Sequence, residues 1–164
     1  MKALDWYAGA GGYTLAMRRA GVEVVGACER DMAKRAAYVE ACGIPAWFGE
    51  DCLDARNVPA ADIWAACESN PRLVAWATKT VAEHRPTWVW CETVRQNEDT
   101  VWDALEAMGY RVSNGYAGAR VHIIAGPSGV VIPELPAHRR ELKEQSDAAT
   151  LAIVLAALLG SANG

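Results

Sequence analysis

The chain has 164 residues, the size of one ordinary domain, and its hydrophobic content of 52% is enough for one sizeable core. The formal net charge of -4 excludes an overall basic field for gripping nucleic acid, so any DNA contact needs a local patch. Five cysteines without CxxC spacing argue against a disulfide framework or a zinc site, and they are typical of reduced thiols in a cytoplasmic protein. We therefore expect a single cytoplasmic domain over residues 1–164.

Short apolar runs alternate with helical patterns along the chain. Strands are predicted at residues 2–9, 22–29, 45–51, 61–66 and 86–92, followed by a closing pair at 110–118 and 119–129. Helices are predicted at residues 12–21, 31–43, 70–84, 97–109 and 138–159. Such alternation requires crossover connections, which predicts an α/β fold with a mostly parallel sheet. The longest apolar run is too short to span a bilayer, so we expect no membrane contact.

A glycine-rich turn, residues 9–12 (GAGG), joins the first strand to the first helix. Glycines let the backbone pass close to a ligand and expose free N–H groups at the helix start. Glu29 ends the second strand about 20 residues later, where an acidic side chain can accept hydrogen bonds from both ribose hydroxyls of a nucleoside cofactor. Asp51, after the third strand, suits an adenine amino group. The alternative is that both are solvated carboxylates or helix caps; their order along the chain favours a nucleoside site.

Several segments resemble the motifs of one enzyme family, the C5-cytosine DNA methyltransferases. Residues 4–21 (LDWYAGAGGYTLAMRRAG) resemble the opening motif, and residues 24–43 (VVGACERDMAKRAAYVEACG) resemble the second. Weaker similarity follows in collinear order at GEDCLDA (49–55), PTWVWCETV (86–94), LEAMGYRV (105–112), ARVHIIAG (119–126) and QSDAATLAIVLAALL (145–159). The resemblance covers most of the chain and implies a Rossmann-like core that binds S-adenosyl-L-methionine (SAM).

The family pattern also implies roles for individual residues. Tyr7 takes the place of an aromatic residue beside the adenine, and a tyrosine keeps the stacking face. By this resemblance, Gly9, Gly11 and Gly12 form the loop around the methionine part of SAM. Glu29 binds the ribose and Asp51 the adenine. The expected cofactor-binding residues are these five and Tyr7.

The family's nucleophile is a cysteine thiolate that attacks C6 of a flipped-out cytosine. In residues 61–73 (ADIWAACESNPRL), one alignment places Ser69 at that position and another places Asn70. Cys67 lies earlier and has no preceding proline. A serine hydroxyl is far less ionised than a thiol at neutral pH, so Ser69 would need a strong base beside it.

A structural interpretation of this loop is favoured over a catalytic one. In it, Cys67 is a buried thiol at the end of a strand, and Ser69 or Asn70 caps the helix that begins near Pro71. Cys67 would act as a nucleophile only if the loop were remodelled. Both a natural loss and an engineered cysteine-to-serine change at Ser69 stay open.

Two further candidate residues lie in the second half of the chain. Glu92, in an ETV segment where the family has ENV, could contact the cytosine edge or pair with Arg95 or Arg120; both interpretations stay open. Only Arg120 is left of the family's RxR pair. The catalytic candidates are therefore Ser69, Glu92, Arg120 and Cys67.

The region that holds the target-recognition domain in the family is very short here. Residues 126–142 (GPSGVVIPELPAHRREL) leave no room for a separate domain, which is suggestive of a phage or mobile-element protein. The three histidines, at 84, 122 and 138, lack ligand spacing, and we expect no metal.

Three functions stay open. The first is a minimal C5-cytosine methyltransferase homologue that binds SAM and lacks conventional cysteine-based catalysis on its own. Its expected partners are DNA or a pyrimidine nucleotide, with a second copy or another subunit supplying target recognition. The second is a non-catalytic module that binds SAM or protein. The third is a SAM-dependent enzyme with altered chemistry at a pyrimidine.

Overall fold

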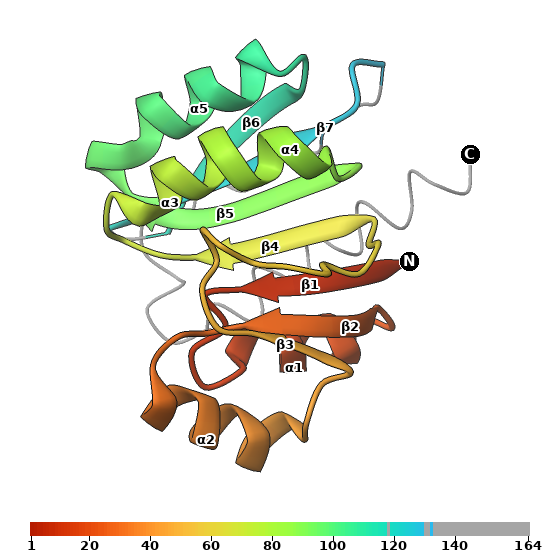
Figure 1. Ribbon diagram of the computed structural model, residues 1–164. Coiled ribbons are helices and arrows are strands. Elements are labelled where there is room, and N and C mark those ends of the chain that lie inside the picture. The colour runs from red at the N-terminus through yellow and green to blue at the C-terminus, as the bar shows by residue number, and fades with distance from the viewer. Residues whose placement is uncertain (118, 130–131, 133–164) are drawn as a thin grey trace.

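Seven strands form one sheet in residues 1–117, 119–129 and 132, the part of the chain that the computed structural model describes (Figure 1). They are β1 (Lys2–Trp6), β2 (Glu23–Cys28), β3 (Trp47–Gly49), β4 (Ile63–Cys67), β5 (Trp88–Val94), β6 (Arg111–Ala117) and β7 (Arg120–Gly126). The strand order is β3-β2-β1-β4-β5-β7-β6, and only β7 runs antiparallel to its neighbours. The mostly parallel sheet and the closing strand pair predicted from the sequence are confirmed.

The helices follow the predicted order as far as the description extends. They are α1 (Gly12–Arg19), α2 (Met32–Cys42), α3 (Arg72–Trp76), the π-helical η1 (Ala77–Val81), α4 (Ala82–His84), the 3₁₀ turn η2 (Arg95–Asn97) and α5 (Glu98–Ala107). Asp31 caps α2 as predicted, because its carboxylate accepts hydrogen bonds from the N–H groups of Ala33 and Lys34. The predicted helix at 138–159 lies outside the described residues.

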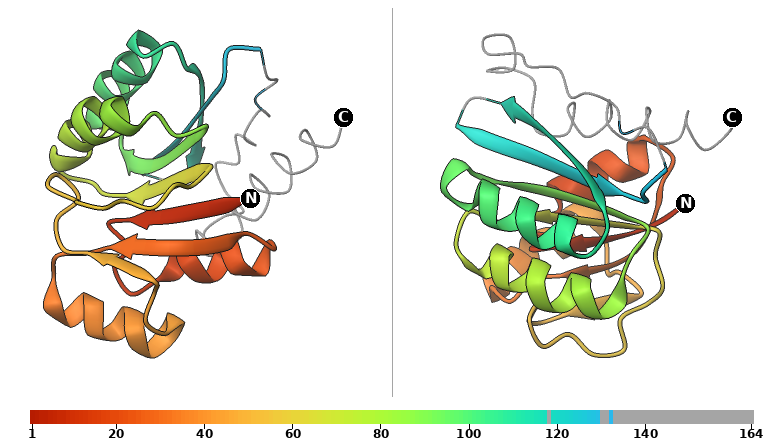
Figure 2. Two further views of the ribbon diagram at one scale, coloured as in Figure 1. Left: turned by 45° about the vertical axis from the view of Figure 1, so that its right-hand side comes forward. Right: turned by 90° about the horizontal axis from the view of Figure 1, so that it is seen from above.

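Helices lie on both faces of the sheet, with α1 and α2 on one face and α3, α4 and α5 on the other (Figure 2). Successive side chains of each strand point to alternate faces. On one face, Leu4 and Trp6 belong to a core shared with α3, η1 and α5. On the other, Ala3 packs against α1, and α2 covers Ala27 through Tyr38. A strand buried on both sides has little room for charge, so the presence of Asp5 in β1 calls for an explanation.

The predicted helix at 70–84 is continuous but contains the π-helical segment η1. Side chains of this segment tie it to the loop after β3, since Thr80 donates to the carbonyl of Cys52 and Lys79 to that of Leu53. Such π-turns often occur near functional sites. The helix begins beside the loop that follows β4.

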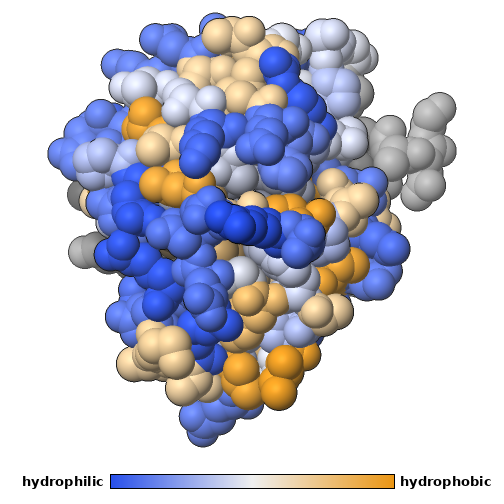
Figure 3. All heavy atoms as spheres, in the orientation of Figure 1, coloured by the Kyte–Doolittle hydropathy of each residue, from blue (hydrophilic) through white to orange (hydrophobic). Residues whose placement is uncertain are grey.

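The carboxyl ends of the parallel strands meet at one edge of the sheet, between α2 and α3 (Figure 1). Hydrophilic side chains gather on the surface at that edge, on the left of the view in Figure 3. In open α/β sheets, ligands bind at this edge beside the point where the strand order reverses. Among the described residues, no helix is long and apolar enough to cross a membrane.

Candidate cofactor and acceptor site

The glycine loop between β1 and α1 has the backbone shape that only glycine adopts easily. Gly9 and Gly11 have φ values of +54° and +89°, and the Gly11 N–H donates to the carbonyl of Ala8. A side chain at Gly11 would meet Cys42 Sγ at 2.3 Å, whereas the space beside Gly9 is open to 4 Å. Gly11 therefore packs the loop against α2, and Gly9 leaves its backbone open to a ligand.

Glu29 holds this loop in place. One carboxylate oxygen accepts the Gly9 N–H at 3.0 Å, and the other accepts the Asp31 N–H at 2.8 Å. Both bonds are charge-assisted, and Glu29 is nearly buried. Because each carboxylate oxygen carries a second lone pair, Glu29 keeps the capacity to accept hydroxyl groups from a ligand. The predicted ribose-binding residue thus also joins the first strand's loop to the second strand's.

Asp5 is a buried carboxyl that the sequence did not single out as a site residue. Its Oδ2 accepts hydrogen bonds from the Thr14 N–H and hydroxyl, and that hydroxyl lies 2.8 Å from the Tyr38 hydroxyl. Burial raises the pKa of Asp5 to about 7, although the bonds from Thr14 oppose the shift. Asp5 fixes the first turn of α1 directly behind the glycine loop.

Tyr7 and Asp51, both predicted to lie beside the adenine, each interact with α3. The Tyr7 hydroxyl donates to the carbonyl of Arg72, and its ring meets Trp76 edge-on. Asp51 accepts from the Leu53 N–H and forms an ion pair of 2.6 Å with Arg72. Burial tends to raise the pKa of Asp51, but the Leu53 N–H and the Arg72 guanidinium hold it below its ordinary value. Both contacts are made through Oδ1 of Asp51, and its side chain is 42% exposed.

The loop after β4 is a tight turn organised by its own side chains. Glu68 Oε1 accepts the N–H groups of Ser69 and Asn70, and Asn70 Oδ1 accepts that of Arg72. Of the two predicted capping residues, Asn70 accepts the N–H of the first residue of α3 and Ser69 does not, but the N-cap position itself is Pro71, which has no side-chain cap bond. Within the described residues, no hydrogen bond joins the Ser69 hydroxyl to a base of the kind that activates a serine nucleophile.

Asn97, which the sequence did not single out, anchors this turn to the sheet. Its side-chain amide donates to the carbonyls of Ser69 and Asn70 and to the Thr93 hydroxyl. Thr93 stands where the family has the asparagine of ENV. In this chain the side-chain amide that bonds the turn belongs to Asn97, four positions after Thr93.

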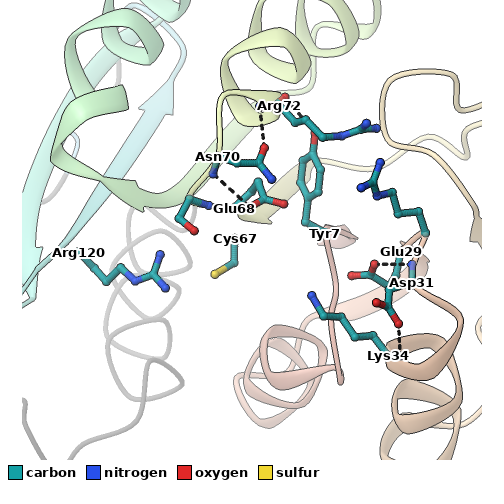
Figure 4. Close-up of a pocket in the computed structure, with 11 residues that line it drawn as sticks. Tyr7, Glu29, Asp31, Lys34, Cys67, Glu68, Asn70, Arg72 and Arg120 are labelled. Atoms are coloured by element: carbon teal, nitrogen blue, oxygen red, sulfur yellow. Dashed lines mark hydrogen bonds between the residues drawn. The ribbon is translucent and has the colours of Figure 1, made fainter.

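Cys67 is the last residue of β4, as expected, but it is not fully buried. The prediction of a buried thiol is wrong in this respect, because Cys67 is half-buried and borders the cavity described below. The β4 strand ends at Cys67, so the side chain lies where the sheet surface opens into the loop. In Figure 4 its sulfur and the Arg120 guanidinium point toward one another.

Glu92 is buried in β5, with an exposed fraction of 2%. Its Oε2 accepts a short hydrogen bond from the Tyr13 hydroxyl, and its Oε1 lies 3.5 Å from Arg120 Nε. Of the two pairing partners considered from the sequence, the structure selects Arg120. Arg95 instead stacks on the Tyr116 ring.

A cavity of about 350 Å³ lies between the residues that follow β2 and those that follow β4 (Figure 4). Its lining is polar and consists of Tyr7, Glu29, Arg30, Asp31, Lys34, Cys67, Glu68, Ser69, Asn70, Arg72 and Arg120. Of the residues predicted from the sequence, the cavity brings together five: Tyr7, Glu29, Cys67, Ser69 and Arg120. The three glycines, Asp51 and Glu92 do not belong to the lining. Three of these five contact a lining residue: Gly9 bonds Glu29, Asp51 pairs with Arg72, and Glu92 pairs with Arg120.

The lining residues that sequence reasoning missed had a usable signal. Arg30, Asp31 and Lys34 directly follow β2 at the same sheet edge as Glu29. Charged residues directly after a parallel strand meet at the ligand-binding edge, so their position alone pointed to the site. Within the described residues, no group of three or more His, Cys, Asp or Glu side chains is placed to hold a metal ion. His138 lies outside that part.

The sheet order and the flanking helices define the Rossmann-like fold of SAM-dependent methyltransferases. No family model and no curated protein matches the chain. The chain is, however, similar in structure to several solved methyltransferases.

Three of these similar structures span different methyltransferases. A ribosomal protein L11 methylase from Lactobacillus delbrueckii subsp. bulgaricus has a TM-score of 0.67 at 16% identity, over 77% of this chain and 69% of that chain. A putative DNA modification methyltransferase encoded within an E. coli prophage has a TM-score of 0.65 at 16% identity, over 81% and 49%. The S. pombe Dnmt2 methyltransferase has a TM-score of 0.61 at 17% identity, over 77% and 49%. At these identities the likeness establishes the fold, and the chain spans about half the length of the last two.

Proposed function

We propose that the chain binds SAM in the cavity between the glycine loop and the loop after β4. The observation that carries this proposal is the Glu29 carboxylate, which holds the Gly9 N–H and borders the cavity at the ligand-binding edge of the sheet. An acidic residue in that position accepts ribose hydroxyls in dinucleotide-binding folds. The similarity in fold to SAM-dependent methyltransferases supports the same assignment.

The residues present fit this cofactor. The open space beside Gly9 admits close approach of a ligand to the backbone, and the cavity volume falls within the usual range for small-molecule sites, roughly 300–1,000 Å³. The lining offers cations for a carboxylate and carboxylates for an ammonium group. When bound, SAM would supply an electrophilic methyl group for an acceptor beside the loop after β4, which we call the proposed acceptor loop.

We further propose that the chain is a homologue of C5-cytosine DNA methyltransferases without their conventional cysteine catalysis. Ser69 occupies the position of the nucleophile in one alignment and Asn70 in the other, and no hydrogen bond joins the Ser69 hydroxyl to a base among the described residues. Glu92, the candidate for the cytosine edge, has a hydrogen-bond donor or an ion-pair partner at each oxygen. A DNA or pyrimidine nucleotide acceptor is consistent with the similarity to a prophage DNA modification methyltransferase.

Calorimetry with SAM and S-adenosylhomocysteine tests the binding proposal. We expect saturable binding of both ligands at a single site. Absence of heat at millimolar ligand, in a sample shown to be folded by circular dichroism, would overturn it.

A separate experiment tests the loss of cysteine chemistry. The protein is incubated with SAM and 5-fluorocytosine DNA, and covalent adducts are sought by gel electrophoresis; tritiated methyl transfer to DNA and to free nucleotides is measured in parallel. We expect no adduct from the wild-type chain, and an adduct from Ser69→Cys if the serine stands at the attacking position. Ser69→Ala is the matched control. A wild-type adduct that disappears in Cys67→Ala would instead make Cys67 the nucleophile.

A further inference from the structure

Glu92 and Tyr13 form a buried pair that links the two halves of the site. Tyr13 lies in α1, directly after the glycine loop, and its hydroxyl donates to Glu92 Oε2. The two residues are 6% and 2% exposed. A buried carboxylate needs such donors, because an unpaired charge away from water is costly.

The two oxygens of Glu92 are held in different ways. Oε2 faces Tyr13, whose ring packs on Trp90 with 4.3 Å between ring centroids, so this donor has little freedom to move. Oε1 faces Arg120, whose side chain is 41% exposed, at the longer distance of 3.5 Å. Arg120 lines the cavity and Tyr13 does not. The fixed bond to Tyr13 therefore turns the other oxygen, Oε1, toward the cavity side.

The position of Glu92 in the sheet places this carboxylate next to the end of β4. In the register of the sheet, Glu92 is paired with Cys67 of β4, the strand-end residue that borders the cavity. Side chains paired in this way lie on the same face of the sheet. The oxygen turned toward Arg120 thus lies beside the proposed acceptor loop.

Tyr13 is the second residue of α1 and directly follows the glycine loop, which is proposed to hold SAM. Gly11 and Gly12 precede it, and its neighbour Thr14 is bonded to Asp5 through both N–H and hydroxyl. A ligand bound against the glycine loop would therefore contact backbone that continues into the first turn of α1. That turn carries Tyr13, whose hydroxyl donates to Glu92. Tyr13 is a short physical link from the cofactor side to Glu92.

We propose that Tyr13 is a positioning residue that couples the glycine loop to the orientation of the Glu92 carboxylate. The inference rests on the proposed function, since it assigns the glycine loop to SAM and Glu92 to the acceptor side. It predicts that the Tyr13–Glu92 bond contributes to ligand affinity although neither residue lines the cavity.

The test combines a double-mutant cycle with a matched control. S-adenosylhomocysteine affinity is measured by calorimetry for the wild type, Tyr13→Phe, Glu92→Gln and the double variant. We expect Tyr13→Phe to weaken binding about three- to tenfold, and to have no further effect in the Glu92→Gln background. Tyr116→Phe, which also removes a hydroxyl that donates to a carboxylate, that of Glu98, should leave the affinity unchanged. An equal effect of Tyr13→Phe in both backgrounds means a packing role and overturns the proposal.

A second measurement works without ligand. Amide hydrogen exchange at Gly11 and Thr14 should accelerate in Tyr13→Phe and in Glu92→Gln, and stay unchanged in Tyr116→Phe. If the wild type binds no S-adenosylhomocysteine, the proposed function fails while the exchange data still decide the coupling. Should Glu92→Gln be too unstable for these measurements, the exchange rates of Tyr13→Phe against Tyr116→Phe decide: equal rates overturn the coupling.

Discussion

The glycine loop and the loop after β4 are each organised by a glutamate that lines the cavity, but the two glutamates form bonds over different distances along the chain. Glu29 bonds the backbone at Gly9 and at Asp31, and so joins the ends of two strands. Glu68 bonds the backbone of its immediate neighbours Ser69 and Asn70. The first loop is therefore shaped by the sheet as a whole, whereas the second is a local turn that Asn97 attaches to β5. A ligand would meet a preorganised surface on one side and a more adjustable one on the other.

The largest effect on this contrast is expected from Gly11→Ala. Its positive φ and the 2.3 Å approach to Cys42 Sγ leave no space for a methyl group. We expect the free energy of unfolding to fall by about 2–4 kcal/mol in urea titrations. The control is Gly12→Ala, which begins α1 and has open space, and it should change stability by less than about 0.5 kcal/mol. Equal losses in the two variants would mean that the loop is not held as described.

Glu29→Gln is expected to produce the next largest effect, on ligand affinity. The amide keeps the shape, but it removes the charge and replaces one of the two acceptor oxygens with an NH2 group, so one of the bonds from Gly9 and Asp31 is lost and the proposed ribose contact is weakened. We expect S-adenosylhomocysteine affinity, measured by calorimetry, to fall about 100-fold.

Glu68→Gln is the matched control for that variant, because it removes the same charge from the other loop. Glu68 also lines the cavity but bonds only the backbone of its own turn, so we expect Glu68→Gln to weaken binding clearly less than Glu29→Gln, by about tenfold or less. If both glutamines weakened binding equally, the contrast between the long-range and the local loop would be lost.

Asp5, which lies behind the glycine loop, makes the free energy of unfolding depend on pH in a way that one substitution can isolate. Its pKa of about 7 in the folded protein exceeds the unfolded value of 3.8, so the folded state retains a proton that the unfolded state releases. This group therefore lowers the free energy of unfolding as pH rises from about 4 to 7, by up to about 1.4 kcal/mol per pH unit, and has no further effect above that window. We expect Asp5→Asn to lack this contribution, so the stability difference between variant and wild type should change across pH 4–7. A difference that is constant with pH would contradict the prediction.

The sequence predicted most of the fold because its signals were local. Alternating strands and helices, the capping Asp31 and the glycine turn each depend on neighbouring residues, and each is present in the structure. The parallel order followed from the crossover connections. The π-helical segment of the helix after β4 was not predicted, because the spacing of apolar residues in a short segment does not distinguish the α-helical from the π-helical hydrogen-bond pattern.

The site was only partly predictable because its supporting contacts are long-range. Tyr7, Glu29, Cys67, Ser69 and Arg120 meet at one cavity, as their places at strand ends suggested. The bond between Tyr13 and Glu92 joins residues 79 positions apart, and no local pattern reveals it. The ion pair between Asp51 and Arg72 likewise joins residues 21 positions apart.

The smallest expected effect is at Asn97, and it tests how independent the two loops are. Asn97→Ala removes the donor that holds the carbonyls of Ser69 and Asn70, yet these lie near solvent and can bond to water instead. We expect a stability loss of about 1 kcal/mol and about fivefold faster amide exchange in the turn. The amides of Gly9 and Gly11 should keep their rates, because Glu29 and Asp5 support them separately.

The matched control for this prediction is Asn114→Ala. Asn114 also donates from its side-chain amide, to Glu98 and Tyr116, but it lies in β6 at the far edge of the sheet. It should leave exchange in the turn unchanged. Acceleration of Gly9 and Gly11 in Asn97→Ala to the same extent as the turn would show that the two loops open together. In that case the acceptor turn would share the preorganisation of the glycine loop, and the local bonds of Glu68 would not describe what holds it.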